Sequence, residues 1–74
     1  MSELINSLKD KRTIQGWTQE TLAERVGVTR QTIIAIEKAK FIPSVKLALA
    51  LAAALEIPLQ ELFWLDEPVD ASQP

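Results

Sequence analysis

Gly27 stands between two short apolar patterns of helical spacing and leaves almost no chain to connect them. Before it, Leu22 and Val26 lie four positions apart, which places their side chains on one face of a helix. Glycine suits the left-handed backbone conformation that closes a helix, and only Val28 and Thr29 follow before the next pattern begins. Two helices joined by so short a turn must share one small core, so the sequence predicts a helix–turn–helix unit.

Hydroxyl residues mark where three of the expected helices begin. Thr18, Thr29 and Ser44 each stand just ahead of an apolar pattern. Their hydroxyl oxygens can accept a backbone N–H two or three positions further on, which is the usual way to cap a helix N-terminus. The sequence therefore predicts helix starts directly after these three residues.

The apolar spacing elsewhere completes an all-α class with five helices. No stretch alternates over enough residues to demand a sheet, although Phe63–Leu65 is a candidate extended segment. The expected helices cover residues 3–15, 18–27, 30–38, 44–55 and 58–65.

The chain has 74 residues, which is the size of one domain. We expect a folded domain over residues 1–65. Residues 66–74 carry two prolines and three carboxylates and no apolar pattern, so we expect this acidic tail to be disordered.

The formal net charge of −2 hides an uneven distribution along the chain. Residues 1–46 hold all eight Lys and Arg against five Asp and Glu, a net charge of +3, whereas residues 47–74 hold five acidic residues and no basic ones, a net charge of −5. This asymmetry is typical of a basic working face with an acidic back or tail. A solvated surface with uneven charges explains the same numbers equally well.

The composition leaves little room for catalysis or for a metal. There is no His, Cys or Tyr and no glycine-rich phosphate loop, so no pair of nucleophile and base is visible and we expect no enzyme. Asp66, Glu67 and Asp70 lack the glycine-turned loop of a calcium site, so we expect no metal and no cofactor. The apolar run Leu47–Leu55 is too short to span a bilayer. We therefore expect a cytoplasmic protein with no membrane partner, and no small-molecule ligand is evident.

The outer face of the third helix carries side chains whose chemistry suits a DNA major groove. Ile33 and Ile36 anchor this helix to the core, and the opposite face holds Arg30, Gln31, Ile34, Ala35 and Lys38. Arginine bonds guanine O6 and N7, glutamine bonds adenine N6 and N7, and small apolar side chains contact thymine methyl groups. The residues at the start of a recognition helix are the ones that contact base edges, so this face predicts binding in a major groove.

The same residues form a pattern that resembles a known family. Residues 18–37 read TQxxLAxxxGVTRQTIxxIE, where x is any residue, and the likeness continues through Pro43-Ser44 and Leu47-Ala48 to Phe63. This pattern is similar to the Cro/CI-type (XRE family) helix-turn-helix of phage repressors and bacterial regulators, in its small stand-alone form. The resemblance covers roughly residues 8–65 and implies a lambda-repressor-like DNA-binding domain.

The resemblance implies a role for each matching position. Arg30, Gln31, Ile34 and Ala35 would contact bases. The residues expected at the sugar-phosphate backbone are Thr18, Gln19, Thr29, Thr32, Lys38, Lys40 and Ser44. Arg12 and Glu37 would form a salt bridge that ties the first helix to the third. The family pattern usually has Gly or Asn where Ala39 stands and Gly where Glu56 stands, so we expect these two helices to end differently.

The resemblance also implies a function. We expect a transcriptional regulator, a repressor that binds a near-palindromic operator on double-stranded DNA as a homodimer. Aromatic residues are enriched at interfaces, so Leu59, Phe63, Trp64 and Leu65 are the candidate dimer contacts. The −5 charge after residue 46 motivates one alternative, an antitoxin-like protein-interaction module with secondary DNA binding.

Overall fold

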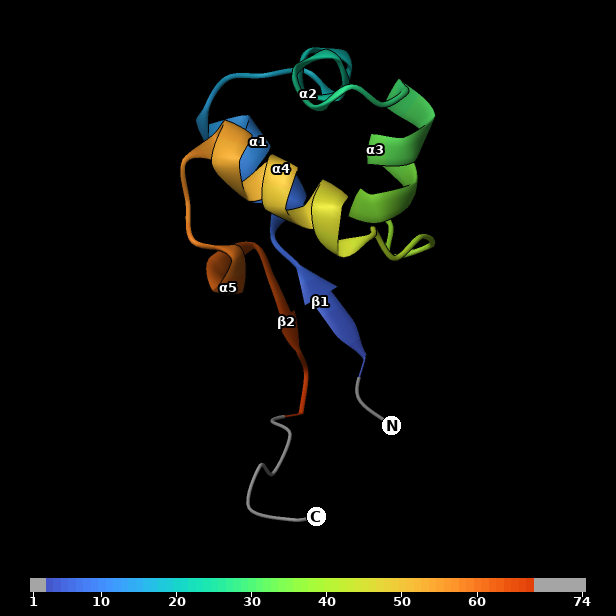
Figure 1. Cartoon of the computed structure of the whole chain (residues 1–74), viewed down its shortest axis with the longest axis vertical. Helices are drawn as coiled ribbons and strands as arrows, with labels where there is room; N and C mark the ends of the chain where they lie inside the picture. The colour runs from blue at the N-terminus through green and yellow to red at the C-terminus, as the bar shows by residue number, and fades with distance from the viewer. Residues whose placement is uncertain (1–2, 68–74) are drawn as a thin grey trace.

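The computed structural model describes residues 3–67 and shows five short helices with a two-stranded ribbon beneath them (Figure 1). The predicted all-α, five-helix class is confirmed. The elements, in chain order, are β1 (Leu4–Asn6), α1 (Leu8–Ile14), α2 (Gln19–Val26), α3 (Arg30–Glu37), α4 (Val45–Leu55), α5 (Leu59–Leu62) and β2 (Phe63–Leu65).

All three predicted N-caps are formed. The hydroxyl of Thr18 accepts the N–H of Thr21 at 3.0 Å, and that of Thr29 accepts the N–H of Thr32 at 3.3 Å. Ser44 caps α4 in the same way, accepting from the third residue of that helix at 3.1 Å. These local bonds satisfy backbone donors that have no partner inside a helix, which is why the helices begin where the sequence predicted.

Left-handed residues follow four of the helices, and Gly16, with a φ of 78°, is the one after α1. Gly27, with a φ of 76°, closes α2 as predicted. Ala39 follows α3 with a φ of 58°, and Glu56 follows α4 with a φ of 56°. The expectation that these two helices end differently is therefore wrong. The backbone N–H of Lys40 donates to the carbonyl of Ala35 at 2.8 Å, and this bond holds the left-handed turn although a side chain makes that conformation costly.

The ribbon corrects the predicted first and fifth helices. β1 pairs with β2 in antiparallel register, with Ile5 opposite Trp64. The first helix therefore begins at Leu8 rather than at residue 3, and the fifth ends at Leu62 rather than at residue 65. The candidate extended segment Phe63–Leu65 is confirmed, because it is the partner strand.

Long-range backbone contacts explain why the N-terminal residues leave the helix. The N–H of Ser7 donates to the carbonyl of Leu62 at 3.0 Å, and its hydroxyl donates to the carbonyl of Glu61 at 2.7 Å. At the far end of the ribbon, the N–H of Glu3 donates to Asp66 Oδ1 at 2.8 Å, and the N–H of Asp66 donates to the carbonyl of Glu3 at 2.9 Å. The rest of the predicted tail, residues 68–74, lies outside the described residues.

One apolar core holds the helices together. α2 and α3 pack on each other and α2 also packs on α4, which crosses in front of α1 in Figure 1. Within residues 3–67, no helix is both long and apolar enough to cross a membrane. The buried cluster consists of Leu8, Leu22, Ala23, Ile33, Ile36, Leu51, Ala52, Leu55 and Leu62.

Candidate nucleic-acid interface

The turn between α2 and α3 fixes the direction of the recognition helix. The N–H of Val28 donates to the carbonyl of Ala23 at 3.0 Å, which closes α2 tightly around Gly27. Ile33 and Ile36 are 0% and 1% exposed and anchor α3 to the core. With one face of α3 fixed in this way, its opposite face turns outward.

The outward face of α3 begins with two exposed polar residues. Arg30 and Gln31 are exposed in the first turn of the helix, whereas Ile34 and Ala35 are partly buried further along it. This gradient places the long polar side chains at the N-terminal end of α3, where a recognition helix contacts bases. The predicted base contacts therefore share one face, and their contact with DNA stays a prediction.

An open cleft joins the starts of α2 and α3. It has a volume of about 420 Å³ and is lined by Arg12, Thr18, Gln19, Glu20 and Arg30. The structure thus brings together two predicted backbone contacts, one predicted base contact and the predicted salt-bridge arginine. Sequence reasoning did not predict Glu20 at this site.

A nearly buried ionic network forms the floor of this region. Arg12 Nε donates to Glu37 Oε2 at 2.7 Å and Arg12 Nη2 donates to Glu37 Oε1 at 3.2 Å, so the expected salt bridge is present and bidentate. The two side chains are 12% and 5% exposed. Arg12 Nη1 also donates to the carbonyl of Trp17 at 2.8 Å. The carboxylate of Glu37 is therefore paired with a cation and nearly excluded from solvent.

Gln19 takes part in the same network, which the sequence did not predict. Its Nε2 donates to Glu37 Oε1 at 3.0 Å, from the first position of α2. A glutamine amide has a second N–H and a carbonyl oxygen, so this bond orients the side chain without consuming its capacity to bind. Glu37 thus joins α1, α2 and α3 through one carboxylate.

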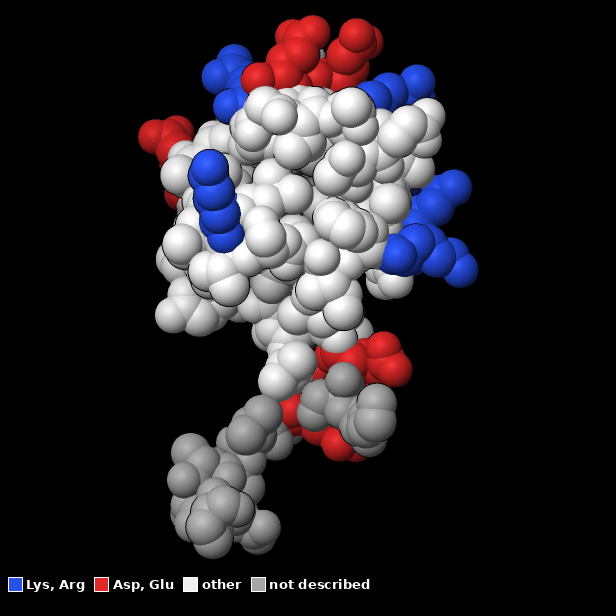
Figure 2. All heavy atoms as spheres, turned by 45° about the vertical axis from the view of Figure 1, so that its right-hand side comes forward, with Lys and Arg blue, Asp and Glu red and all other residues white. Residues whose placement is uncertain are grey.

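The remaining predicted backbone contacts lie at both ends of α3. Thr29 and Thr32 share a hydroxyl contact of 3.1 Å at the N-terminal end. Lys38, Lys40 and Ser44 are exposed beyond its C-terminal end. In Figure 2, Lys and Arg side chains stand on both sides of the molecule, with a group on the right, while most of the Asp and Glu side chains in view lie at its top and near its foot.

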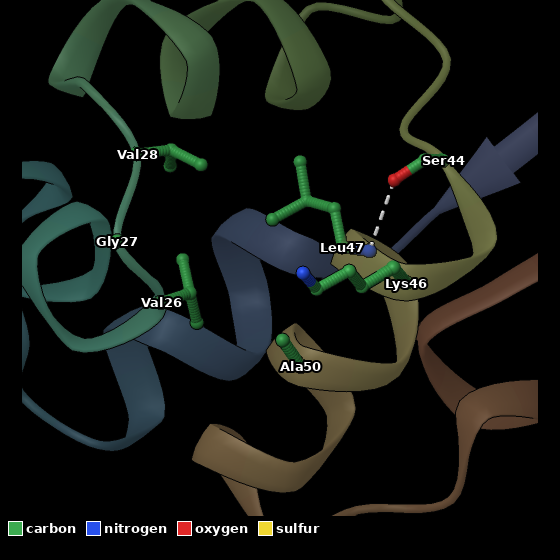
Figure 3. A pocket seen from close by; sticks show the side chains of 7 residues that line it. All are labelled: Val26, Gly27, Val28, Ser44, Lys46, Leu47 and Ala50. Carbon is green, nitrogen blue, oxygen red and sulfur yellow. Dashed lines mark hydrogen bonds between the residues drawn. The ribbon is translucent and has the colours of Figure 1, made fainter.

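A shallow pocket lies beneath the turn. It has a volume of about 220 Å³, and in Figure 3 Val26 and Val28 face Leu47 and Ala50 across it. Ser44 lies at one end of this pocket, where its hydroxyl is already engaged as the cap of α4. The underside of the turn therefore faces α4 across this pocket.

The four candidate dimer residues do not form one exposed surface. Leu59 and Phe63 are partly buried and pack against the core. Trp64 and Leu65 are 41% and 42% exposed on the ribbon. Only the second pair offers much of its side chain to a partner.

Asn6 is a structural residue that sequence reasoning missed. Its Nδ2 donates to the carbonyl of Ile36 at 3.0 Å, near the end of α3. Its Oδ1 accepts the N–H of Leu8 at 3.1 Å, so it also serves the start of α1. An Asn two positions before a helical pattern was the available signal, because such residues often cap helices.

Known proteins of similar sequence also belong to the helix-turn-helix class. The helix-turn-helix family HTH_3 matches residues 8–62. The chain is 47% identical over 62 residues to the "Uncharacterized HTH-type transcriptional regulator YgzD" of Bacillus subtilis (strain 168), covering 84% of this chain and 94% of that protein. It is 52% identical over 61 residues to an "Uncharacterized HTH-type transcriptional regulator" of Methanothermobacter thermautotrophicus, covering 81% and 88%.

Solved structures agree with the sequence relatives. The chain resembles the restriction-modification controller protein C.AhdI from Aeromonas hydrophila, with a TM-score of 0.72, 39% identity and coverage of 76% of this chain and 85% of that one. It also resembles the hypothetical transcription factor NHTF from Neisseria, with a TM-score of 0.69, 28% identity and coverage of 73% and 62%. These matches confirm the predicted lambda-repressor-like fold. The chain therefore belongs to the HTH_3 (XRE-type) helix-turn-helix family of DNA-binding transcriptional regulators.

Proposed function

We propose that this protein is a sequence-specific repressor that binds a near-palindromic operator as a homodimer. The observation that carries the proposal is the first turn of α3, where Arg30 and Gln31 are exposed beside the cleft at the start of α2. Long polar side chains at that end of a recognition helix are placed to reach base edges in a major groove.

Base reading would divide among the outward residues of α3. Arg30 would bond guanine O6 and N7, and Gln31 would bond adenine N6 and N7. Ile34 and Ala35 are only partly exposed, which suits apolar contact with thymine methyl groups rather than hydrogen bonding. Each bidentate pair contributes about 1–3 kcal/mol of discrimination against the wrong base.

Backbone contacts would hold α3 in register with the groove. The N-terminus of α2 carries the positive end of a helix dipole, and Gln19 is held there by Glu37. Thr18 stands at the start of α2, and Thr29 and Thr32 stand at the start of α3. The exposed residues Lys38, Lys40 and Ser44 lie beyond the C-terminal end of α3. Phosphates on both sides of the groove would thus be bound, which fixes position without reading sequence.

A dimer would extend recognition from one half-site to two. A single module of this size contacts few base pairs, and dimeric helix-turn-helix proteins bind half-sites about 34 Å apart, one turn of DNA. The relatives and one structural neighbour carry names that describe transcriptional regulators or a controller protein. We infer repression by occlusion, because a dimer bound across a promoter would cover the DNA that a polymerase needs. A DNA-binding regulator acts where the DNA is, so we place the protein in the cytoplasm.

Transcription from a purified promoter tests the repressor assignment. A duplex site selected by the protein would be placed across the start site of a promoter, and transcript would be measured against protein concentration. We expect transcript to fall as the site fills. The double variant Arg30→Ala, Gln31→Ala should leave transcript unchanged at the same concentrations. A rise in transcript with the unmodified protein would reject repression while keeping sequence-specific binding.

A further inference from the structure

Asn6 is the point where the ribbon meets the recognition helix. It is the last residue of β1, where it lies opposite Phe63 of β2, and it is partly buried. In Figure 1, β1 is the strand of the ribbon that lies on the side of α3. A small cavity of about 70 Å³ is lined both by Asn6 and by Ala39, which stands in the turn after α3. The end of β1 therefore lies close to the C-terminal end of α3.

Both ends of the Asn6 amide are bonded, so chemistry fixes its orientation. Its Nδ2 donates to the carbonyl of Ile36 at 3.0 Å, and its Oδ1 accepts the N–H of Leu8 at 3.1 Å. A reversed amide would place two donors together at Leu8 and two acceptors together at Ile36. Leu8 is 0% exposed, so this bond also ties Asn6 to the core. An ionised aspartate at this position has no donor and would keep only the bond to Leu8.

The C-terminal end of α3 takes its other backbone bonds from the turn that follows it. The N–H groups of residues 38–40 donate to the carbonyls of residues 34–36. These bonds shape the turn, but they move with the helix and do not fix its place in the domain. A carbonyl oxygen accepts two hydrogen bonds, and Asn6, 30 positions earlier in the chain, supplies the second one at Ile36. This bond therefore attaches the backbone of α3 to another part of the fold.

The next residue of α3 is attached to different elements. Glu37 is bonded to Arg12 of α1 and to Gln19 of α2. Successive residues at this end of α3 are thus held by the ribbon and by the first two helices. The other end of α3 is held by the short turn at Gly27. Loss of the Asn6 bond would remove one of these attachments and allow α3 to pivot about that turn.

We propose that Asn6 is a positioning residue for DNA binding, which holds the C-terminal end of α3 at the angle that a major groove requires. This inference rests on the proposed function, because it takes α3 as the helix that reads DNA. Ile34, Ala35 and Lys38 would all move with that end of the helix. A chain without the Asn6 bond would bind DNA only while α3 has the correct angle. Its apparent dissociation constant would therefore rise by the reciprocal of the fraction of molecules in that state.

Two substitutions of Asn6 test this role. Asn6→Asp keeps the acceptor for Leu8 but turns the donor that faces Ile36 into a second oxygen, so it removes the contact with α3 alone. Asn6→Ala removes both contacts and adds no charge, so a loss that both variants share is not caused by repulsion between DNA and a new carboxylate. Ser7→Ala is the matched control. It removes a neighbouring side-chain bond, of 2.7 Å to the carbonyl of Glu61, that does not involve α3.

Fluorescence anisotropy with a duplex site selected by the unmodified chain measures each dissociation constant. The temperature is one at which circular dichroism shows every variant to be folded, so that lower stability alone does not change the affinity. We expect Asn6→Asp and Asn6→Ala to raise the dissociation constant by about threefold to tenfold, which corresponds to the free energy of one hydrogen bond. Ser7→Ala should leave it unchanged.

Amide hydrogen exchange in the absence of DNA tests the same role without the proposed function. The N–H groups of residues 38–40 are bonded to carbonyls of α3, so their exchange reports on the order of its C-terminal end. We expect these amides to exchange several-fold faster in Asn6→Asp than in the unmodified chain, relative to the amides of α4. In Ser7→Ala their relative exchange should be unchanged.

The inference is overturned if both Asn6 variants bind the duplex as tightly as the unmodified chain, or if Ser7→Ala loses as much affinity as they do. It is also overturned if exchange at residues 38–40 is unchanged in Asn6→Asp, because the bond would then not hold α3. A different pattern identifies failure of the proposed function. If the unmodified chain prefers no duplex while exchange at residues 38–40 still rises in Asn6→Asp, the proposed function fails and the hold of Asn6 on α3 stands.

Discussion

Arg12 and Glu37 stand 25 residues apart in the chain and form a bidentate ion pair with a shortest distance of 2.7 Å. The pair is nearly excluded from solvent, and it joins α1 to the last residue of α3. It explains how a helix that we propose to lie against DNA tolerates a glutamate. Its loss would disturb both the core and the orientation of the recognition helix.

Replacing Arg12 by Ala should destabilise the domain strongly. Removing one partner of a buried pair leaves the other charge without compensation, which costs about 3–5 kcal/mol. The bonds to Trp17 and Glu37 would disappear together. Lys9→Ala is the control, because Lys9 is exposed on the same helix and should change stability by less than about 0.5 kcal/mol. Urea unfolding followed by circular dichroism measures both, and equal effects would contradict a stabilising role for the pair.

Replacing Ala39 by Gly should stabilise the domain. Ala39 has a φ of 58°, where a side chain costs about 1 kcal/mol that glycine avoids. Ala53→Gly is the control, because Ala53 is exposed within α4 and glycine there should cost about 1 kcal/mol. The two changes remove the same methyl group and should shift the melting temperature in opposite directions. A lower melting temperature for both variants would show that the left-handed turn carries no strain.

Replacing Gln31 by Ala should relax recognition at one base position. The affinity for the preferred site should fall by about 1–3 kcal/mol, because a bidentate bond with adenine would disappear. Selection with the variant should show a single degenerate position in each half-site. Unchanged affinity and unchanged preference would place the base-reading residues elsewhere on α3.

Replacing Lys40 by Ala should weaken binding to all sequences alike. Lys40 is exposed beyond α3, and binding of a phosphate there releases counterions without reading bases. The slope of log affinity against log salt concentration should become shallower by roughly one unit, because one phosphate is no longer neutralised. Fluorescence anisotropy at several salt concentrations measures this slope, with Lys9→Ala expected to leave it unchanged. A sequence-dependent fall in affinity for Lys40→Ala would indicate that Lys40 reads a base.

Local chemistry explains which parts of the fold were predictable from the sequence. The caps at Thr18, Thr29 and Ser44 and the turn at Gly27 depend on neighbours a few positions away, so the pattern indicated them correctly. The ribbon depends on β2 pairing with a strand near the other end of the chain, and nothing local to residues 4–6 reveals that partner. Leu4, Ile5 and Leu8 have the spacing of a helix, but pairing with β2 makes residues 4–6 a strand.

Ala39 and Glu56 are two positions where local conformational preference gave the wrong prediction. Intrinsic preference argues against a left-handed conformation at either residue, yet both adopt it. The packing of α3 and α4 decides where each helix must stop, and the bonds across the turn compensate for the local cost. Local preference is a weak guide when the surrounding core fixes the geometry.

The candidate site was predictable in its composition and less so in its connections. The resemblance indicated the Arg12–Glu37 pair, which the structure contains. It did not indicate that Gln19 bonds the same carboxylate, because that contact depends on how α2 and α3 cross. The exposed face of α4 could not be predicted, for another reason. α4 is apolar on nearly every side, so its sequence does not distinguish the buried face from the exposed one.

Selection of binding sites from a pool of random duplexes, at near-physiological salt, tests the central claim most directly. The purified protein would be incubated with the pool, and bound duplexes would be amplified and sequenced. We predict enrichment of a two-fold symmetric motif whose half-site centres lie about one helical turn apart. Weak, salt-sensitive binding that enriches no sequence would contradict the claim that α3 reads DNA.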